Sequence, residues 1–169
     1  HNFASSYETS NTLVNKLWKN ITWSSSGNFL SIPTDCPQRN ERLGWAGDIS
    51  VFSRTATYLA DVSQFLRRYV QSMRDVQRSD GRFPDIAPLG GGFGGLLWGS
   101  AGITVPWECY QQYGDKRLLN EHYDAMSQYI QYILDKMIEK ETGLLVQNRA
   151  WGDLGDWLGL EDEKNDKSL

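Results

Sequence analysis

The sequence predicts an all-α fold built from helical hairpins. Apolar residues recur at helical spacing in several segments, and no stretch alternates polar and β-branched residues convincingly. The hairpin pattern also recurs after about fifty residues, with long irregular loops between the hairpins. Such repeats are typical of an α/α toroid or solenoid. About five helices fit in 169 residues, so we expect an incomplete ring.

The first hairpin is expected near the middle of the chain. A helix over about residues 7–23 comes before it and has no hairpin partner close in sequence. The hairpin then consists of a helix from about residue 48 and a second helix over 61–78, with Asp61 as the N-cap of the latter. Because these two helices meet almost without a linker, we expect them to be antiparallel neighbours.

The second hairpin follows the same plan. A helix over about 100–113 stops at Gly114, and Asp115 caps a long helix that continues to about residue 140. Residues 143–147 could form a brief strand. Since an incomplete ring leaves the inner faces of its helices exposed, we expect a longer parent polypeptide to continue the chain and close the ring.

Composition excludes several functional classes. The net charge is −4 without a basic block, so neither nucleic acid nor a membrane surface is an expected partner, and no apolar run is long enough to span a bilayer. Cys36 and Cys109 are expected to be free thiols, and with only His1 and His122 available we predict no metal and no cofactor. The compartment is not fixed, with a periplasmic or extracellular location favoured over a cytoplasmic one.

Tryptophan is unusually frequent. Seven tryptophans and eight tyrosines suggest either a thick core or a cleft lined by flat aromatic faces, on which sugar rings stack well. Trp18, Trp23 and Trp107 lie in helical patterns and are expected in the core. Most of the others lie in the long loops at about 24–47, 79–97 and 143–157, whose length favours a functional role.

A polar loop before the second helix is the strongest candidate site. Residues 35–48 hold three carboxylates, two guanidiniums and a tryptophan without helical or strand periodicity. Each acid also has a purely structural interpretation. Asp48 could be only a helix N-cap, Asp35 only a turn former, and Glu41 only half of a solvated ion pair with Arg39 or Arg42.

This loop resembles the signature of the bacterial α-L-rhamnosidases of glycoside hydrolase family 78, whose catalytic domain is an (α/α)6 barrel. Four further segments occur in the order that the family shows: Leu97-Trp98-Gly99-Ser100-Ala101, Val105-Pro106-Trp107, Tyr113-Gly114-Asp115 and Gly155-Asp156-Trp157-Leu158. Asn40 and Ser100 depart from the pattern, since both positions commonly hold aspartate. The resemblance implies that residues 1–169 form the first half of the catalytic domain.

The resemblance also implies roles for individual residues. Glu41 would be the general acid of an inverting hydrolysis of terminal α-L-rhamnosides, and Asp35, Arg39 and Asp48 would bind sugar hydroxyls or support the acid. Trp45, Trp98 and Trp157 would form the apolar walls of the subsite, with Asp156 beside the last of them; Asp156 could instead be a turn that only aims this indole. The general base would lie beyond residue 169, so we expect negligible activity from these residues alone. The expected partners are a rhamnose-containing glycan or glycoside and the remainder of the parent polypeptide.

The acid role places a demand on the surroundings of Glu41. Nearby cations favour an ionised carboxylate, so the acid needs either an apolar wall such as Trp45 or a like charge brought close. We therefore expect Arg39 to point to substrate or to pair with an aspartate, leaving Glu41 beside the indole. Two other functions remain open: a non-catalytic sugar-binding α/α module, and a different α/α-toroid glycosidase that keeps Glu41 as its acid.

Overall fold

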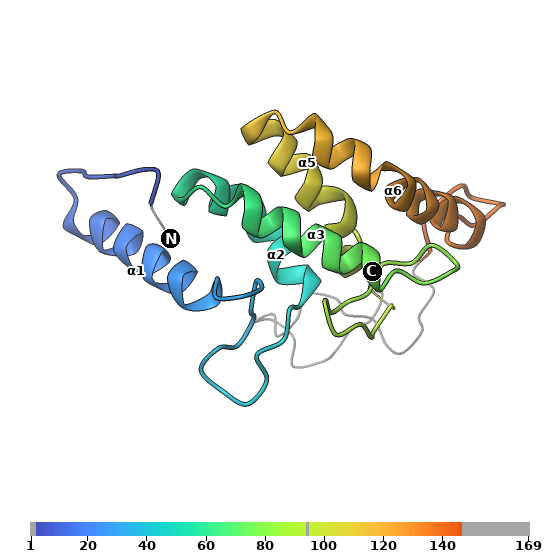
Figure 1. Cartoon of the computed structure of the whole chain (residues 1–169), viewed down its shortest axis with the longest axis horizontal. Coiled ribbons are helices and arrows are strands. Elements are labelled where there is room, and N and C mark those ends of the chain that lie inside the picture. The colour runs from blue at the N-terminus through green and yellow to red at the C-terminus, as the bar shows by residue number, and fades with distance from the viewer. Residues whose placement is uncertain (1–2, 94, 147–169) are drawn as a thin grey trace.

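The computed structural model describes residues 3–93 and 95–146, and this part of the chain is helical (Figure 1). Its helices are α1 (Thr12–Asn28), α2 (Ala46–Leu59), α3 (Ser63–Asp75), the single-turn α4 (Leu96–Gly99), α5 (Ala101–Tyr113) and α6 (Lys116–Lys136). β pairing in the described ranges is limited to isolated bridges, and the brief strand predicted near residue 145 is reduced to one bridge between Ile138 and Leu145. The predicted all-α class is confirmed.

Two helix starts differ from the prediction because local polar groups compete for the backbone. The first helix begins five residues late, since the Asn11 side chain accepts from the N–H groups of Leu13 and Val14 and so caps α1. The predicted N-cap Asp61 is also wrong. Its carboxylate accepts from the Ser63 N–H at 3.1 Å, but it lies one residue outside the helix, whose N-cap is Val62.

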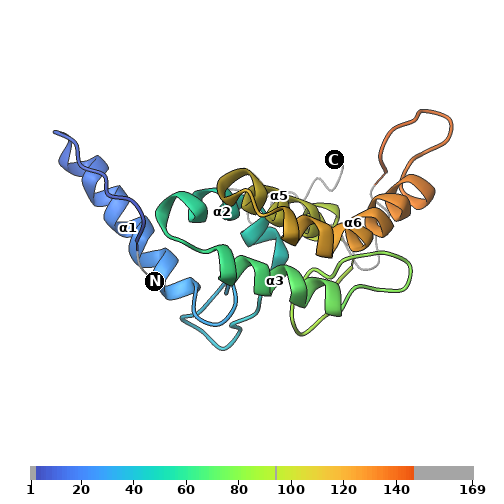
Figure 2. The same cartoon turned by 45° about the horizontal axis from the view of Figure 1, so that its top comes forward.

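Helix α5 organises the packing of the described residues. It contacts α2 most extensively and also packs against α3 and α6, and both views show it among these three helices (Figures 1 and 2). The predicted pair α2 and α3 is not among the helix pairs of the described residues that contact extensively, and both helices pack on α5 instead. The core that results is built from small residues of α2 and α5 against aromatic and aliphatic side chains of α3 and α6.

Helix α1 projects from one edge of this body (Figure 2). Only Ser25 among its residues is buried, and Trp23 is 71% exposed. Trp107 on α5 is 51% exposed, so the prediction that these two tryptophans fill the core is wrong, while Trp18 is half-buried against the Tyr7 ring at 5.6 Å between centroids. No helix in the described ranges is both long and apolar enough to cross a membrane.

His122 replaces a hydrogen bond that Pro106 removes from α5. Pro106 lies inside the helix and has no N–H, so the Gly102 carbonyl lacks its usual intrahelical donor. The His122 ring nitrogen Nε2 of α6 lies 2.9 Å from that carbonyl and therefore carries the hydrogen and donates to it. The imidazole is fully buried and stacks on Phe83, with 5.4 Å between ring centroids. Nδ1 has no hydrogen-bond partner among the residues that the structure describes.

This buried histidine should make stability depend on pH. Burial, which disfavours the charged ring, lowers the pKa of His122 from 6.5 to about 4, and the positive charge of Arg74 adds to the effect. Between these pH values the unfolded chain binds a proton that the folded chain does not, so the free energy of unfolding falls as the pH is lowered from 6.5 to 4, by at most about 3 kcal/mol.

Urea unfolding of wild type and His122→Gln at pH 7, 5.5 and 4 measures this contribution. Glutamine keeps a donor but does not titrate, so the stability advantage of the wild type should be largest at pH 7 and should shrink toward pH 4. An advantage that stays constant over this range would contradict the assignment.

Candidate active site

The polar loop between α1 and α2 is closed by its own backbone. Asp35 donates its N–H to the Leu43 carbonyl at 3.1 Å, and the Leu43 N–H donates to the Asp35 carboxylate, also at 3.1 Å. Arg42 adopts a left-handed backbone conformation (φ 55°), and its side chain donates to the Pro37 carbonyl at 3.2 Å. Asp35 is therefore a loop-closing residue as well as a candidate ligand for substrate.

The end of the loop is fixed to the core by pairing with residues 85–87. Ala46 donates to the Asp85 carbonyl at 2.8 Å, and Ala87 donates to the Gly44 carbonyl at 3.0 Å. The buried Tyr69 hydroxyl donates to the same Gly44 carbonyl at 3.0 Å, and burial raises the pKa of this phenol. A side chain at Gly44 would meet the Ala87 carbonyl oxygen at 2.0 Å, so only glycine allows this approach. The backbone on both sides of Trp45 is therefore fixed, and its half-buried side chain packs at the edge of the core.

Glu41 is held by two donors. Arg39 Nη2 forms an ion pair with Oε2, and the Trp45 indole N–H donates to Oε1 at 2.9 Å. The expectation that Arg39 avoids Glu41 and pairs with an aspartate is therefore wrong for this structure. Trp45 does lie beside Glu41 as predicted, but it presents its polar N–H rather than an apolar face. Since the Arg39 side chain is 63% exposed, water screens this ion pair and weakens it.

Asp48 completes a group of three carboxylates. It lies in the first turn of α2, whose N-cap is Trp45 with no side-chain cap bond, so the interpretation of Asp48 as an N-cap is wrong. The pKa of Asp48 is raised, first because surrounding atoms displace part of the water around this otherwise exposed side chain, and further by the negative charges of Asp35 and Glu41. A hydrogen bond to its own backbone partly offsets these effects. The three acids thus act on one another electrostatically.

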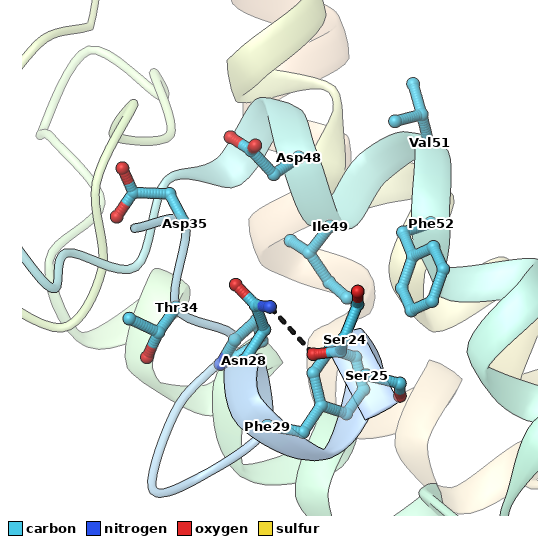
Figure 3. A pocket seen from close by; sticks show the side chains of 11 residues that line it. Ser24, Ser25, Asn28, Phe29, Thr34, Asp35, Asp48, Ile49, Val51 and Phe52 are labelled. Carbon is cyan, nitrogen blue, oxygen red and sulfur yellow. Dashed lines mark hydrogen bonds between the residues drawn. The ribbon is translucent and has the colours of Figure 1, made fainter. Parts of the chain in front are cut away.

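Asp35 and Asp48 share a cavity of about 280 Å³ between the end of α1 and the start of α2 (Figure 3). Its apolar wall includes the buried side chains of Phe29 and Ile49. Carboxylate, amide and hydroxyl groups line the rest. The lining residues are Ser24, Ser25, Asn28, Phe29, Pro33, Thr34, Asp35, Asp48, Ile49, Val51 and Phe52. Such a wall beside hydrogen-bond acceptors suits a small ligand with both hydroxyl and apolar faces.

The remaining predicted site residues have different positions. Arg39, Glu41, Trp45 and Trp98 do not line this cavity. Trp98 is 9% exposed, and its ring packs so closely on α2 that a side chain at Gly47 would meet it at 2.5 Å. It can therefore offer only an edge to a ligand within the described part of the chain. Asp156 and Trp157 lie outside the described residues.

Cys36 adds a thiol to the loop. Cys36 and Cys109 are both free, and Cys36 Sγ lies within 4.8 Å of carboxylate oxygens of Asp35 and Glu41, a spacing that could suit a metal ion. However, a hydrogen bond with Asp35 raises the pKa of the Cys36 thiol, which favours its protonated form, and Arg39 already occupies Glu41. Asp35, Cys36 and Glu41 thus already have partners within the loop.

The residue that the sequence analysis missed is Asp85. It is fully buried, its carbonyl accepts from Ala46, and its side chain accepts from the Gly95 N–H at 3.3 Å. The signal available in the sequence is an aspartate directly after Phe83-Pro84 and before Ile86-Ala87, an apolar context in which an acid needs a specific partner.

Comparison with known proteins identifies the family. The family profile described as bacterial alpha-L-rhamnosidase 6 hairpin glycosidase domain matches residues 2–169. The chain belongs to this family. It is 46% identical over 164 residues to an alpha-L-rhamnosidase of Streptomyces avermitilis, covering 95% of the chain and 15% of that protein, and 37% identical over 152 residues to one of Alteromonas sp. (89% and 16%).

A solved structure shows the same fold. The crystal structure of Streptomyces avermitilis alpha-L-rhamnosidase complexed with L-rhamnose superposes with a TM-score of 0.84 at 42% identity, covering 95% of this chain and 15% of that one. The six-hairpin fold predicted for the chain is therefore confirmed by its relatives. The chain spans only about a sixth of the length of these relatives.

The close contact between Gly47 and Trp98 can be tested by a matched pair of substitutions. Gly47→Ala forces the Trp98 ring away from α2 and should lower the free energy of unfolding by about 1–3 kcal/mol. Gly27→Ala, in α1, where the added methyl group has no neighbour within 4 Å in the described part of the chain, should be neutral or stabilising by up to about 1 kcal/mol. Urea unfolding of both variants decides between them, and equal effects would contradict the described packing.

Proposed function

We propose that the polypeptide containing this chain hydrolyses terminal α-L-rhamnosides with inversion, and that Glu41 is its general acid. The observation that carries the proposal is the group formed by the Asp35, Glu41 and Asp48 carboxylates and the adjoining cavity, in a chain of the rhamnosidase six-hairpin family. A structural relative was crystallised with L-rhamnose, which supports this sugar as the substrate.

Asp35 and Asp48 would bind the sugar. Carboxylate oxygens accept hydrogen bonds from hydroxyl groups, and both acids lie beside an apolar wall containing Ile49 and Phe52 (Figure 3). The rhamnosyl group of a terminal rhamnoside carries three free ring hydroxyls and a methyl group, which match these two kinds of surface. Trp45 and Trp98, with Asp156 and Trp157, would complete the subsite.

Arg39 must move during the reaction. The oxygen that donates the proton has to face the glycosidic oxygen of the substrate, but in this structure Arg39 binds Oε2 and the Trp45 indole binds Oε1, so one of these partners has to give way. The ion pair of Arg39 and Glu41 is therefore the arrangement of the free enzyme, and it breaks when substrate binds. The exposed Arg39 side chain is free to turn toward a sugar hydroxyl, which reconciles its present partner with a role in binding.

The general base would come from the rest of the polypeptide. Inverting hydrolysis needs a second carboxylate about 6.5–9.5 Å from the acid, with room for a water molecule. Glu108 lies near Arg54 instead, at 4.0 Å, and neither residue lines the cavity beside Asp48. We propose that residues 1–169 form the first half of the catalytic barrel and supply the acid without the base. Release of rhamnose by this segment alone would overturn that division.

Glu41→Gln tests the acid role in the complete polypeptide. With p-nitrophenyl α-L-rhamnoside the variant should lose about 10²–10⁴-fold in kcat while keeping its affinity for rhamnose. The loss should be greater with an alkyl rhamnoside, because an alcohol leaves less readily than nitrophenol and depends more on the acid. Glu141→Gln, an exposed position outside the site, serves as the matched control and should retain wild-type kcat.

The outcomes separate the three functions. Equal losses for both substrates would exclude Glu41 as the acid. A wild-type polypeptide that binds rhamnose without hydrolysing either substrate would indicate the non-catalytic sugar-binding module. Hydrolysis of another glycoside with the same dependence on Glu41 would indicate a different α/α-toroid glycosidase.

A further inference from the structure

Asp85 is a buried acid that the proposed mechanism does not use. It lies in the connection between α3 and α4 with no exposed surface. Its backbone carbonyl and its side chain contact different segments. The backbone carbonyl accepts from Ala46 at the start of α2, whereas the side chain accepts from the Gly95 N–H immediately before α4. Asp85 therefore connects two segments that both lead to the candidate site.

Glycines surround the Asp85 side chain. A methyl group at Gly92 would lie 2.2 Å from Asp85 Oδ2, and one at Gly95 would lie 3.5 Å from Oδ1. Gly91 accepts from the Asp85 N–H at 3.0 Å, but a methyl group at Gly91 would meet no atom of the described residues within 4 Å. The chain thus folds tightly around the carboxyl group at some glycines and not at others.

Two arginines contact Phe93, the residue after Gly92. Arg82 donates to the Phe93 carbonyl at 3.3 Å, and the Arg78 guanidinium lies over the Phe93 ring at 5.3 Å from its centroid. Phe93 has a left-handed backbone (φ 73°), a conformation that an aromatic residue adopts only when its surroundings impose it. These contacts therefore fix the position of Phe93, which directly follows Gly92.

The contacts continue from Asp85 to the sugar subsite. Gly95 precedes the single turn of α4, which carries Trp98, and Trp98 packs on Gly47 next to Asp48. In contrast, the backbone of residues 85–87 holds Gly44 and Ala46, on either side of Trp45 and close to Glu41. A change of the Asp85 side chain would disturb its contact with Gly95 and so the position of Trp98. It would leave the backbone hydrogen bonds to Gly44 and Ala46 in place.

We propose that Asp85 is a positioning residue that sets the place of Trp98, whose exposed edge would contact the sugar, relative to Asp48. The inference rests on the proposed function, since it assumes that Trp98 contacts the sugar. It assigns to Asp85 an effect on sugar binding that is separable from proton donation by Glu41. A residue that only stabilised the fold would change the amount of folded protein but neither KM nor kcat.

The experiment compares Asp85→Asn, Gly92→Ala and Gly91→Ala in the complete polypeptide, with p-nitrophenyl α-L-rhamnoside as the probe. Both glycines have positive φ (80° and 115°), so alanine is strained at each, but only the methyl group at Gly92 meets Asp85. Asp85→Asn and Gly92→Ala should raise KM about tenfold with kcat within about twofold of wild type, and Gly91→Ala should leave both close to wild type.

Each result has a distinct meaning. Equal KM values for the two glycine variants, or an effect on kcat alone, would overturn the role of Asp85. If Asp85→Asn does not fold, as judged by circular dichroism and thermal unfolding, the pair of glycine variants decides the question. A wild-type polypeptide without activity on the probe would instead overturn the proposed function, so the two failures are distinguishable.

Discussion

The candidate site depends on a short backbone pairing between residues 44–46 and 85–87. Two main-chain hydrogen bonds and the Tyr69 hydroxyl fix the end of a polar loop that has no regular structure of its own. Because Gly44 and Ala87 approach so closely, the register between residues 44–46 and 85–87 is fixed. Arg39 compensates the charge of Glu41 within the loop, but the negative charges of Asp35 and Glu41 still act on Asp48, so the position of the loop depends on this backbone pairing rather than on its charges. The rigid core and the polar site therefore meet at this pairing.

The charges of the site are balanced in two ways. Glu41 is compensated locally by Arg39 and the Trp45 indole, whereas Asp48 has a raised pKa because it keeps only part of its water and faces Asp35 and Glu41. The first arrangement can be exchanged for contacts with a ligand at little cost, since Arg39 is exposed. The second favours any ligand that donates hydrogen bonds to Asp48. Both properties suit a polyhydroxylated ligand.

Much of this arrangement could be predicted from the sequence, for reasons that differ by residue. Helical spacing identified the class and most of α2, α5 and α6, and the motif around Glu41 identified the loop and its family. The partner of Arg39 could not be predicted, because an exposed guanidinium can reach several acids and sequence spacing does not choose among them. The burial of Trp98 and the role of Asp85 were also beyond reach, since both depend on contacts between loops far apart in the chain.

The His122 ring supplies the hydrogen bond that Pro106 cannot donate, and this has a consequence for how the region folds. An α-helix ordinarily closes all its interior hydrogen bonds within a single segment, but α5 takes one donor from α6, twenty residues away. Helix α5 therefore reaches full hydrogen bonding only when α6 has docked and the imidazole carries a hydrogen on Nε2. Secondary and tertiary structure form together at this point, so the second hairpin is expected to behave as one cooperative unit rather than as two helices that fold separately and then associate.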